Sequence, residues 1–409
     1  MQITDGKHGD CENQENSGYY FVSVKDIDDG EINYSNARQI TKFDFKDTNR
    51  RTKLENEDIL ITNSGTIGKF VFVNSPLSRK TTFQKSVAII KPNKNKIIPK
   101  FLYYYLISEK RQLVEYAGGT TQKNLLLRDI RNFEVKIPDE SRQKKIIMIL
   151  NDIDQLISVN KKLNKNLEEL MHVLFKKYFI DNNPFYVEND EKWNIIKLKD
   201  LIIRNRDKIN DFDNWKDELL IDLSNMPRFS IAISNFDKGK KFTSNIYKLN
   251  KYDLLFGSIR PYFGKVGFSP INGVVTGTVH SFKPIDDIYY SLVLSLISSK
   301  TFINYTVSVS KGTKMPSVKW DDFINYEFAI PDDLSKIGEY NKILLPLIHK
   351  IEKNILEIQR LTKLRDILLP KLMSGEIDVS KINCDLELKY NYMKYLFNQI
   401  HTPMSKSVV

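Results

Sequence analysis

A long stretch of charged, Leu/Ile-rich helical pattern occurs twice in this chain, and it constrains the fold more than any other feature. The first copy follows Ile137-Pro138-Asp139, and the second follows Ile330-Pro331-Asp332. In the first copy the residues at heptad positions are Ile146, Ile153, Asn160, Leu167 and Leu174 at a, and Ile149, Leu156, Leu163 and Leu170 at d. Such a seam is typical of a coiled-coil helix, which needs a partner to cover its apolar face.

The second copy supplies that partner. Its heptad positions are Ile337, Leu344, Ile351 and Ile358 at a, and Leu347, Asn354, Leu361 and Leu368 at d. Pro346 predicts either a kink or a helix that begins near it. If a pseudo-two-fold axis relates the two halves, the helices run antiparallel, and we expect Asn160 to face Asn354 and to fix the register. The alternative is that each asparagine is a solvated interruption.

The segments between the helices are also duplicated. Glu57-Asp58-Ile59-Leu60 corresponds to Tyr252-Asp253-Leu254-Leu255, and Gly119-Thr120-Thr121-Gln122 corresponds to Gly312-Thr313-Lys314-Met315. Matches in the same order at a nearly constant offset indicate a repeated unit of short strands and helices. The predicted fold class is α+β, with two mixed α/β domains, each followed by a long helix. The predicted boundaries are 1–136 and 184–329 for the domains, 137–183 and 330–379 for the helices, and 380–409 for a tail.

The duplication is incomplete at its start. The run from Trp193 to Leu201 predicts an opening strand and turn for which the first unit has no counterpart. We therefore expect the first unit to begin at a point already inside the fold.

The charge balance favours a polyanionic partner. The net charge is +11 and the pI is near 9.2, although a composition rich in Lys, Asn and Ile also raises the count of cations. Two cysteines, Cys11 and Cys384, are too few for a disulfide framework and indicate a reducing compartment. With no long apolar run and a polar amino terminus, we expect a cytoplasmic protein.

Polar residues in turns before strands are the candidates for contact with such a partner, which would be a nucleic acid if the charge serves binding. Glycine permits close backbone approach, while Lys, Arg and Gln suit phosphates and base edges. The candidates are Thr120, Thr121, Gln122 and Lys123 in the first unit, Lys311, Thr313 and Lys314 in the second, a basic loop with Arg79, Lys80, Gln84 and Lys85, and a loop with Arg260 and Tyr262. The alternative is that these are solvated turns.

Enzymatic motifs are absent or incomplete. The run from Gly65 to Lys69 has too few residues between its glycines for a phosphate loop. The run from Asn182 to Phe185 differs at its first proline from the Asn-Pro-Pro-Phe of adenine methyltransferases. The five histidines have no partner at metal-ligand spacing. We therefore predict no catalytic residues, no metal and no cofactor bound by this chain.

Several motifs together resemble the specificity subunit of type I restriction-modification enzymes. The run Asp5-Gly6-Lys7-His8-Gly9 is similar to the family's Asp-Gly-Thr-His-Gly, with Lys7 in place of threonine. The run from Glu57 to Lys69 is similar to its Gly-Asp-Ile-Leu and Gly-x-x-Gly core. The runs from Leu174 to Asp181 and from Leu368 to Ile377 resemble the ends of its two helices.

The resemblance implies a non-catalytic subunit whose two target-recognition domains each read half of a bipartite DNA site. It also implies that the helices dock two methyltransferase subunits, which carry S-adenosylmethionine and methylate adenine N6, and that restriction subunits join the complex. Two alternatives stay open. One is an interaction protein whose basic charge is compositional, and the other is a self-sufficient modification enzyme with a cofactor site that the sequence does not reveal.

Overall fold

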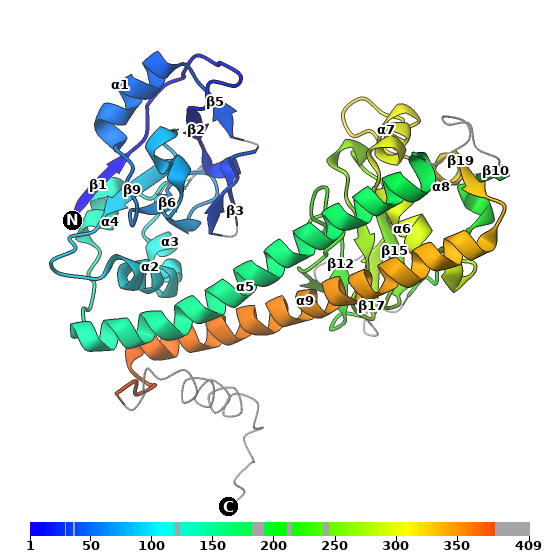
Figure 1. Ribbon diagram of the computed structural model, residues 1–409. Coiled ribbons are helices and arrows are strands. Elements are labelled where there is room, and N and C mark those ends of the chain that lie inside the picture. The colour runs from blue at the N-terminus through cyan, green and yellow to red at the C-terminus, as the bar shows by residue number, and fades with distance from the viewer. Residues whose placement is uncertain are drawn as a thin grey trace, which may run out of the picture. The chain divides into compact units, whose positions relative to one another are not determined.

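The computed structural model describes residues 1–28, 30–35, 37–118, 123–181, 192–210, 215–239 and 245–380. The chain divides into two compact units, Met1–Ile153 with Leu364–Val409, and Asp154–Lys363. Two long helices, α5 (Glu140–Phe175) and α9 (Leu334–Ser374), each contribute to both units (Figure 1). Mixed sheets and two long paired helices confirm the predicted fold class.

The first unit is built on two small sheets. An antiparallel sheet has the order β1 (Gln2–Asp5), β9 (Val87–Lys91), β6 (Ile59–Thr62) and β7 (Phe70–Phe72). A second sheet has the order β5 (Arg38–Gln39), β2 (Tyr20–Val22) and β8 (Thr81–Phe83), with β2 parallel to β8. The central strands β6 and β9 are almost wholly apolar because both of their faces are buried.

The second unit repeats this topology. Its antiparallel sheet has the order β11 (Ile202–Arg204), β18 (Val279–Pro284), β15 (Leu254–Gly257) and β16 (Val266–Phe268). Its other sheet has the order β13 (Asp237–Lys238), β12 (Leu219–Ile221), β17 (Gly273–Thr276) and β14 (Ile246–Leu249), with β12 parallel to β17. The same strand order in both units supports the predicted duplication.

Short helices cover the sheets. In the first unit they are α1 (Lys42–Thr52), α2 (Pro99–Ser108), α3 (Lys110–Glu115) and α4 (Leu127–Asn132), and in the second they are α6 (Tyr290–Ser298), α7 (Lys300–Ser308) and α8 (Trp320–Ile324). A side chain of each long helix accepts a hydrogen bond from the first turn of one of these short helices. The Ile98 N–H, at the start of α2, donates to Gln143 Oε1 of α5 at 2.9 Å, and the Ser291 N–H of α6 donates to Asn341 Oδ1 of α9 at 3.2 Å.

One strand pair occurs only in the second unit among the described residues. There β10 (Trp193–Lys197) pairs with β19 (Glu327–Pro331), and a 3-10 turn, Leu198–Asp200, leads into β11. In the first unit β1 takes the place of β11, and residues 133–139, which correspond to β19, form no strand. The second unit therefore has the additional opening strand that the sequence predicts.

The predicted seam of α9 is confirmed except at Leu347, which is half-buried while Ile348 is buried, and that of α5 is partly wrong. Leu156 and Leu170, expected at d, are 50% and 44% exposed, whereas Ile157 and Met171, one residue later in each turn, are buried. In a coiled coil, the next buried residue can lie either three or four residues after position a. Because apolar residues stand at both positions, the sequence fits both frames. Packing of α5 against α9 and the second unit selects the later frame.

The predicted asparagine pair exists with a different partner. Asn354 Nδ2 donates to Asn164 Oδ1 at 2.7 Å and both side chains are buried, whereas Asn160 lies one turn away and is half-buried. The error follows from the shifted seam of α5. Within the second unit Phe179 contacts Tyr340, with 4.8 Å between ring centroids, so the helices run antiparallel as predicted. Helix α9 continues through Pro346 and does not begin there.

Candidate nucleic-acid interface

In the second unit, one end of the antiparallel sheet gathers four segments that are distant in sequence. At this end β11 and β15 finish and β16 and β18 begin, because Gly257 pairs with Val279 and Phe256 with Val266. The segments are residues 205–208 after β11, 258–265 between β15 and β16, 277–278 between β17 and β18, and 311–317. We call them the loop end of the second unit.

Backbone hydrogen bonds hold two of the predicted loops together. The Arg260 N–H donates to Pro316 O at 2.7 Å, and Lys311 and Ser317 exchange N–H to O bonds of 2.9 and 3.0 Å. The structure therefore brings Arg260 beside the glycine loop that carries Lys311. Thr313 and Lys314 are exposed at the tip of that loop.

Exposed aromatic side chains accompany the cations. Tyr262 is 43% exposed, in the 3-10 turn Pro261–Phe263. Arg228 lies over the Phe263 ring at 3.8 Å, and Phe229, which is 64% exposed, donates its N–H to Gly264 O at 3.0 Å. Phe229 also has a positive φ of 52°, a conformation uncommon for non-glycine residues and frequent at functional sites.

Sequence reasoning missed Arg228 and Phe229. They follow Met226-Pro227 in a segment without a repeated motif. The sequence indicates a binding role there only through a cation and an aromatic residue directly after a proline. The structure places them beside the β15–β16 loop that the sequence did identify.

A buried carboxylate fastens this segment to α5. Glu168 accepts hydrogen bonds from Ser230 Oγ at 2.8 Å and from the Ile231 N–H at 3.2 Å, and its side chain is only 8% exposed. Burial raises the pKa of Glu168 to about 7. Glu168 therefore positions residues 228–231 from the coiled-coil helix.

The first unit has an equivalent loop end, formed among the described residues by 6–9, 63–69, 84–86, 118 and 123–124. The Lys85 N–H donates to Lys7 O at 3.1 Å, and the Asn63 N–H donates to Ser86 O at 3.0 Å. The Leu125 N–H donates to Asn63 O at 2.8 Å, as Val318 donates to Ser258 O at 2.9 Å in the second unit. Gln84, Lys85 and Lys123 thus belong to one surface. The predicted Thr120, Thr121 and Gln122 lie outside the described residues.

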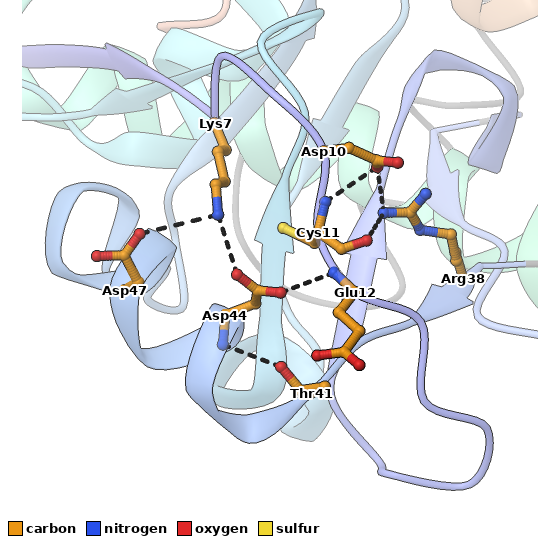
Figure 2. Close-up of polar contacts among 8 residues, drawn as sticks. All are labelled: Lys7, Asp10, Cys11, Glu12, Arg38, Thr41, Asp44 and Asp47. Carbon is orange, nitrogen blue, oxygen red and sulfur yellow. Dashed lines mark hydrogen bonds and ion pairs between the residues drawn. The ribbon is translucent and has the colours of Figure 1, made fainter.

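Figure 2 shows how the Asp5–Gly9 run is anchored. Lys7 Nζ lies 3.0 Å from Asp44 Oδ1 and 3.8 Å from Asp47 Oδ2. Asp44 stands in the first turn of α1, where its N–H donates to Thr41 Oγ1 and its carboxylate accepts the Glu12 N–H at 2.7 Å. The hydrogen bonds from Glu12 and Lys7 hold the pKa of Asp44 below its usual range. Lys7 is therefore a structural cation that ties this loop to α1.

A second ion pair fixes the chain that follows. The Arg38 guanidinium donates to the Asp10 carboxylate and to Cys11 O, the latter at 2.8 Å (Figure 2). The guanidinium also lies over the Phe21 ring, 5.1 Å from its centroid. These contacts shape the loop and leave Lys85 and Lys123 as its exposed cations.

The predicted loop containing Arg79, Lys80, Gln84 and Lys85 is wrong as one segment. Strand β8 separates the two pairs, and Arg79 and Lys80 lie in a 3-10 turn, Pro76–Lys80, that precedes it. Because β8 runs toward the loop end, Gln84 and Lys85 reach it while Arg79 and Lys80 stand at the opposite end of the strand. The intervening strand was not predicted because it is only three residues long and is flanked by cations and polar residues.

Two classes of site are not found in the described part of the chain. It contains no group of three or more His, Cys, Asp and Glu residues that could hold a metal ion. Among the same residues, no helix has the length and apolar content to cross a membrane.

Comparisons with known proteins agree with the motifs. Residues 8–169 match the family model for the type I restriction modification DNA specificity domain. The MjaIX specificity subunit of Methanocaldococcus jannaschii, a type I restriction enzyme subunit, is 26% identical over 392 residues, covering 88% of this chain and 87% of that one. Over these ranges the chain is similar to type I restriction enzyme specificity subunits. The MjaVIII specificity subunit of the same organism is 24% identical and covers 90% of this chain and 89% of its own.

A solved specificity subunit has the same fold. The S subunit from M. genitalium aligns with a TM-score of 0.53 and 15% identity, covering 91% of this chain and 93% of that one. In the present chain, the motifs that carry the resemblance lie at defined places. The Asp5–Gly9 run follows β1, the Glu57–Lys69 run contains β6 and its following turn, and the Leu368–Ile377 run closes α9.

Proposed function

We propose that this chain is the non-catalytic DNA-specificity subunit of a type I restriction-modification complex and reads a bipartite site. The observation that carries the proposal is the repetition of one arrangement. In each unit, loops remote in sequence meet at the same end of the same antiparallel sheet, and they present exposed lysines. The second unit adds Arg228 and the aromatic side chains of Phe229 and Tyr262. Cations serve phosphates, and aromatic and amide groups serve bases.

We further propose the role of each loop. Lys85, Lys123, Lys311 and Lys314 contact phosphates, while Gln84, Arg260, Tyr262 and Thr313 face the bases, with Thr120, Thr121 and Gln122 extending the first surface. Arg228 and Phe229 join the second surface. Arg79 and Lys80 lie apart from both, so we assign them no base contact.

The partners follow from the family. Two methyltransferase subunits dock on the long helices, bind S-adenosylmethionine and methylate adenine N6 after flipping the base. Restriction subunits join this assembly, which acts on DNA in the cytoplasm. This chain supplies specificity and binds no cofactor.

The test is single-molecule sequencing of N6-methyladenine in DNA from cells that express this chain with its methyltransferase subunit. Cells expressing the methyltransferase subunit alone are the reference. We expect a chain-dependent split motif with two defined blocks separated by a fixed run of undefined bases. Absence of chain-dependent methylation, with the complex shown to assemble, would refute the proposal and favour an interaction protein.

Point variants assign the half-sites. Arg260→Ala should relax or abolish one block and leave the other block unchanged, because Arg260 belongs to the second loop end only. Arg79→Ala is the matched control, since it removes the same charge at a position away from the loop end, and it should leave both blocks intact. Equal effects on both blocks would contradict the assignment of one unit to each half-site.

A further inference from the structure

A cavity at the loop end of the second unit has no assigned role. Its lining includes Arg204 at the end of β11, Asn205 and Arg206 after it, Tyr247 of β14, Gly277 and Ser281. The space measures about 230 Å³, including the part open to solvent. The cavity adjoins the β17–β18 turn, whose Thr278 O accepts the Ser258 N–H at 3.0 Å. It is therefore continuous with the candidate DNA surface.

The cavity has excess positive charge. Arg206 lies over the Tyr247 ring at 5.5 Å, and Arg204 lies over the Trp320 ring at 4.5 Å. Neither guanidinium has a carboxylate within ion-pair distance among the described residues. Burial, followed by the neighbouring Arg206, lowers the pKa of Arg204, as expected for two cations held close together. Two such cations are stabilised by an anion between them.

The cavity also contains an unused hydrogen-bonding group. Ser281 is 3% exposed, and its Oγ has no hydrogen-bond partner among the described residues. A buried hydroxyl without a partner costs about 1–3 kcal/mol, so an acceptor is expected to occupy the cavity in the functional state. Asn205, which also lines the cavity, does not accept from Ser281 Oγ; its Nδ2 donates to Asp253 Oδ2 at 2.6 Å.

The first unit lacks this site. Ile3 pairs with Ile90 as Arg204 pairs with Phe282, so Asp5 stands at the position of Arg206. Asp5 is itself bound to Arg51 and His8. Changes to the cavity should therefore affect binding only at the half-site that the second unit contacts.

We propose that this cavity binds one phosphate of the DNA backbone, with charge supplied by Arg204 and Arg206 and a hydrogen bond donated by Ser281. The inference rests on the proposed function and adds a backbone anchor to the second half-site. A tetrahedral oxyanion offers several acceptors to guanidinium and hydroxyl groups at once.

The experiment uses the full chain assembled with its methyltransferase subunit and a duplex carrying the methylation motif. A neutral methylphosphonate replaces each backbone phosphate in turn. We expect one position in a single half-site to weaken wild-type binding about tenfold. The Arg206→Gln complex should be insensitive at that position alone, and its plot of log affinity against log salt should be shallower by about 0.9. Ser281→Ala should weaken binding about fivefold.

Controls separate the possible outcomes. Arg79→Gln should keep the wild-type methylphosphonate profile, and the circular dichroism spectrum of each variant chain reports whether it is folded. Unchanged sensitivity in Arg206→Gln would overturn the inference. So would protection against heat by inorganic phosphate at constant ionic strength without any change in DNA binding, because the site would then serve a free anion. If wild-type complex bound no specific duplex, the proposed function itself would fail.

Discussion

Glu168→Gln tests how the coiled-coil helix holds residues 228–231, the segment proposed to face DNA. The carboxylate of Glu168 accepts hydrogen bonds from Ser230 Oγ and the Ile231 N–H, and its burial raises its pKa from 4.5 to about 7. The folded chain therefore binds the proton more tightly than the unfolded chain. Its contribution to stability is complete below about pH 4.5 and is lost as the pH rises through 7.

The magnitude follows from this shift. Between pH 5 and pH 8 the titration of Glu168 should lower the free energy of unfolding of the second unit by about 2.5 kcal/mol. Glutamine has nearly the same shape, and it retains an acceptor for the Ile231 N–H while its amide can donate to Ser230 Oγ. The Gln variant should therefore keep the fold and lose this component of the pH dependence.

The assay uses the distribution of tryptophans. All three, Trp193, Trp215 and Trp320, belong to the second unit, so their fluorescence reports its unfolding selectively. Thermal melts at pH 5, 6, 7 and 8 should show a midpoint difference between wild type and Glu168→Gln that changes by about 5–10 °C across the range. Glu169→Gln is the matched control, because it removes an exposed carboxylate one residue away and should follow wild type.

Parallel pH curves for wild type and Glu168→Gln would refute the reasoning, because they would show that Glu168 is ionised in the folded chain at no cost. A loss of stability in Glu168→Gln at every pH would also contradict it. That result would mean that the charge on the carboxylate strengthens the loop contacts by more than burial disfavours it.

Three further changes test other contacts of the second unit. Asn354→Ala leaves the Asn164 amide buried without its partner, so the free energy of unfolding by urea, followed by tryptophan fluorescence, should fall by about 1–3 kcal/mol; no loss would mean that water replaces the partner. Gly264→Ala places a Cβ 2.6 Å from the Phe229 ring at a φ of +55°, so specific DNA affinity should fall at least about tenfold with the helices intact by circular dichroism. Unchanged affinity would remove this turn from the interface. Glu352→Ala leaves the Tyr252 and Lys251 donors without their acceptor and should lower the melting temperature of the second unit more than Glu169→Gln does.

The sequence predicts those parts of the fold that depend on local periodicity and on repetition. The heptad pattern of α9 fixes its buried face, and ordered matches at constant offset reveal two similar units. The partner of Asn354 was not predictable in the same way. Leu163 and Asn164 are adjacent, and a pattern that favours leucine in the seam selects the wrong one. Only the packing of α5 on two sides shows that Asn164 is enclosed.

The missed site residues share one cause. Arg206 and Arg228 stand in segments without a repeated motif, and they meet the predicted loops only because antiparallel strands end at one edge of a sheet. Sequence reasoning found the loops whose glycines recur in both units. It could not place beside them residues that differ between the units, which are the residues expected to determine what each unit reads.

That difference has a consequence for the DNA site. The strands align Asp5 with Arg206, and equivalent bridges align Ser64 with Ile259, because Ser64 pairs with Asn124 and Ile259 with Ser317. One scaffold thus presents an acidic and a small polar side chain in the first unit, and a cation and an apolar side chain in the second. Identical readers would select an inverted or direct repeat of one half-site. Because the side chains at equivalent positions have different charge and size, the two methylation blocks should be unrelated in sequence, and two matching blocks would contradict the assignment of these positions to base or phosphate contact.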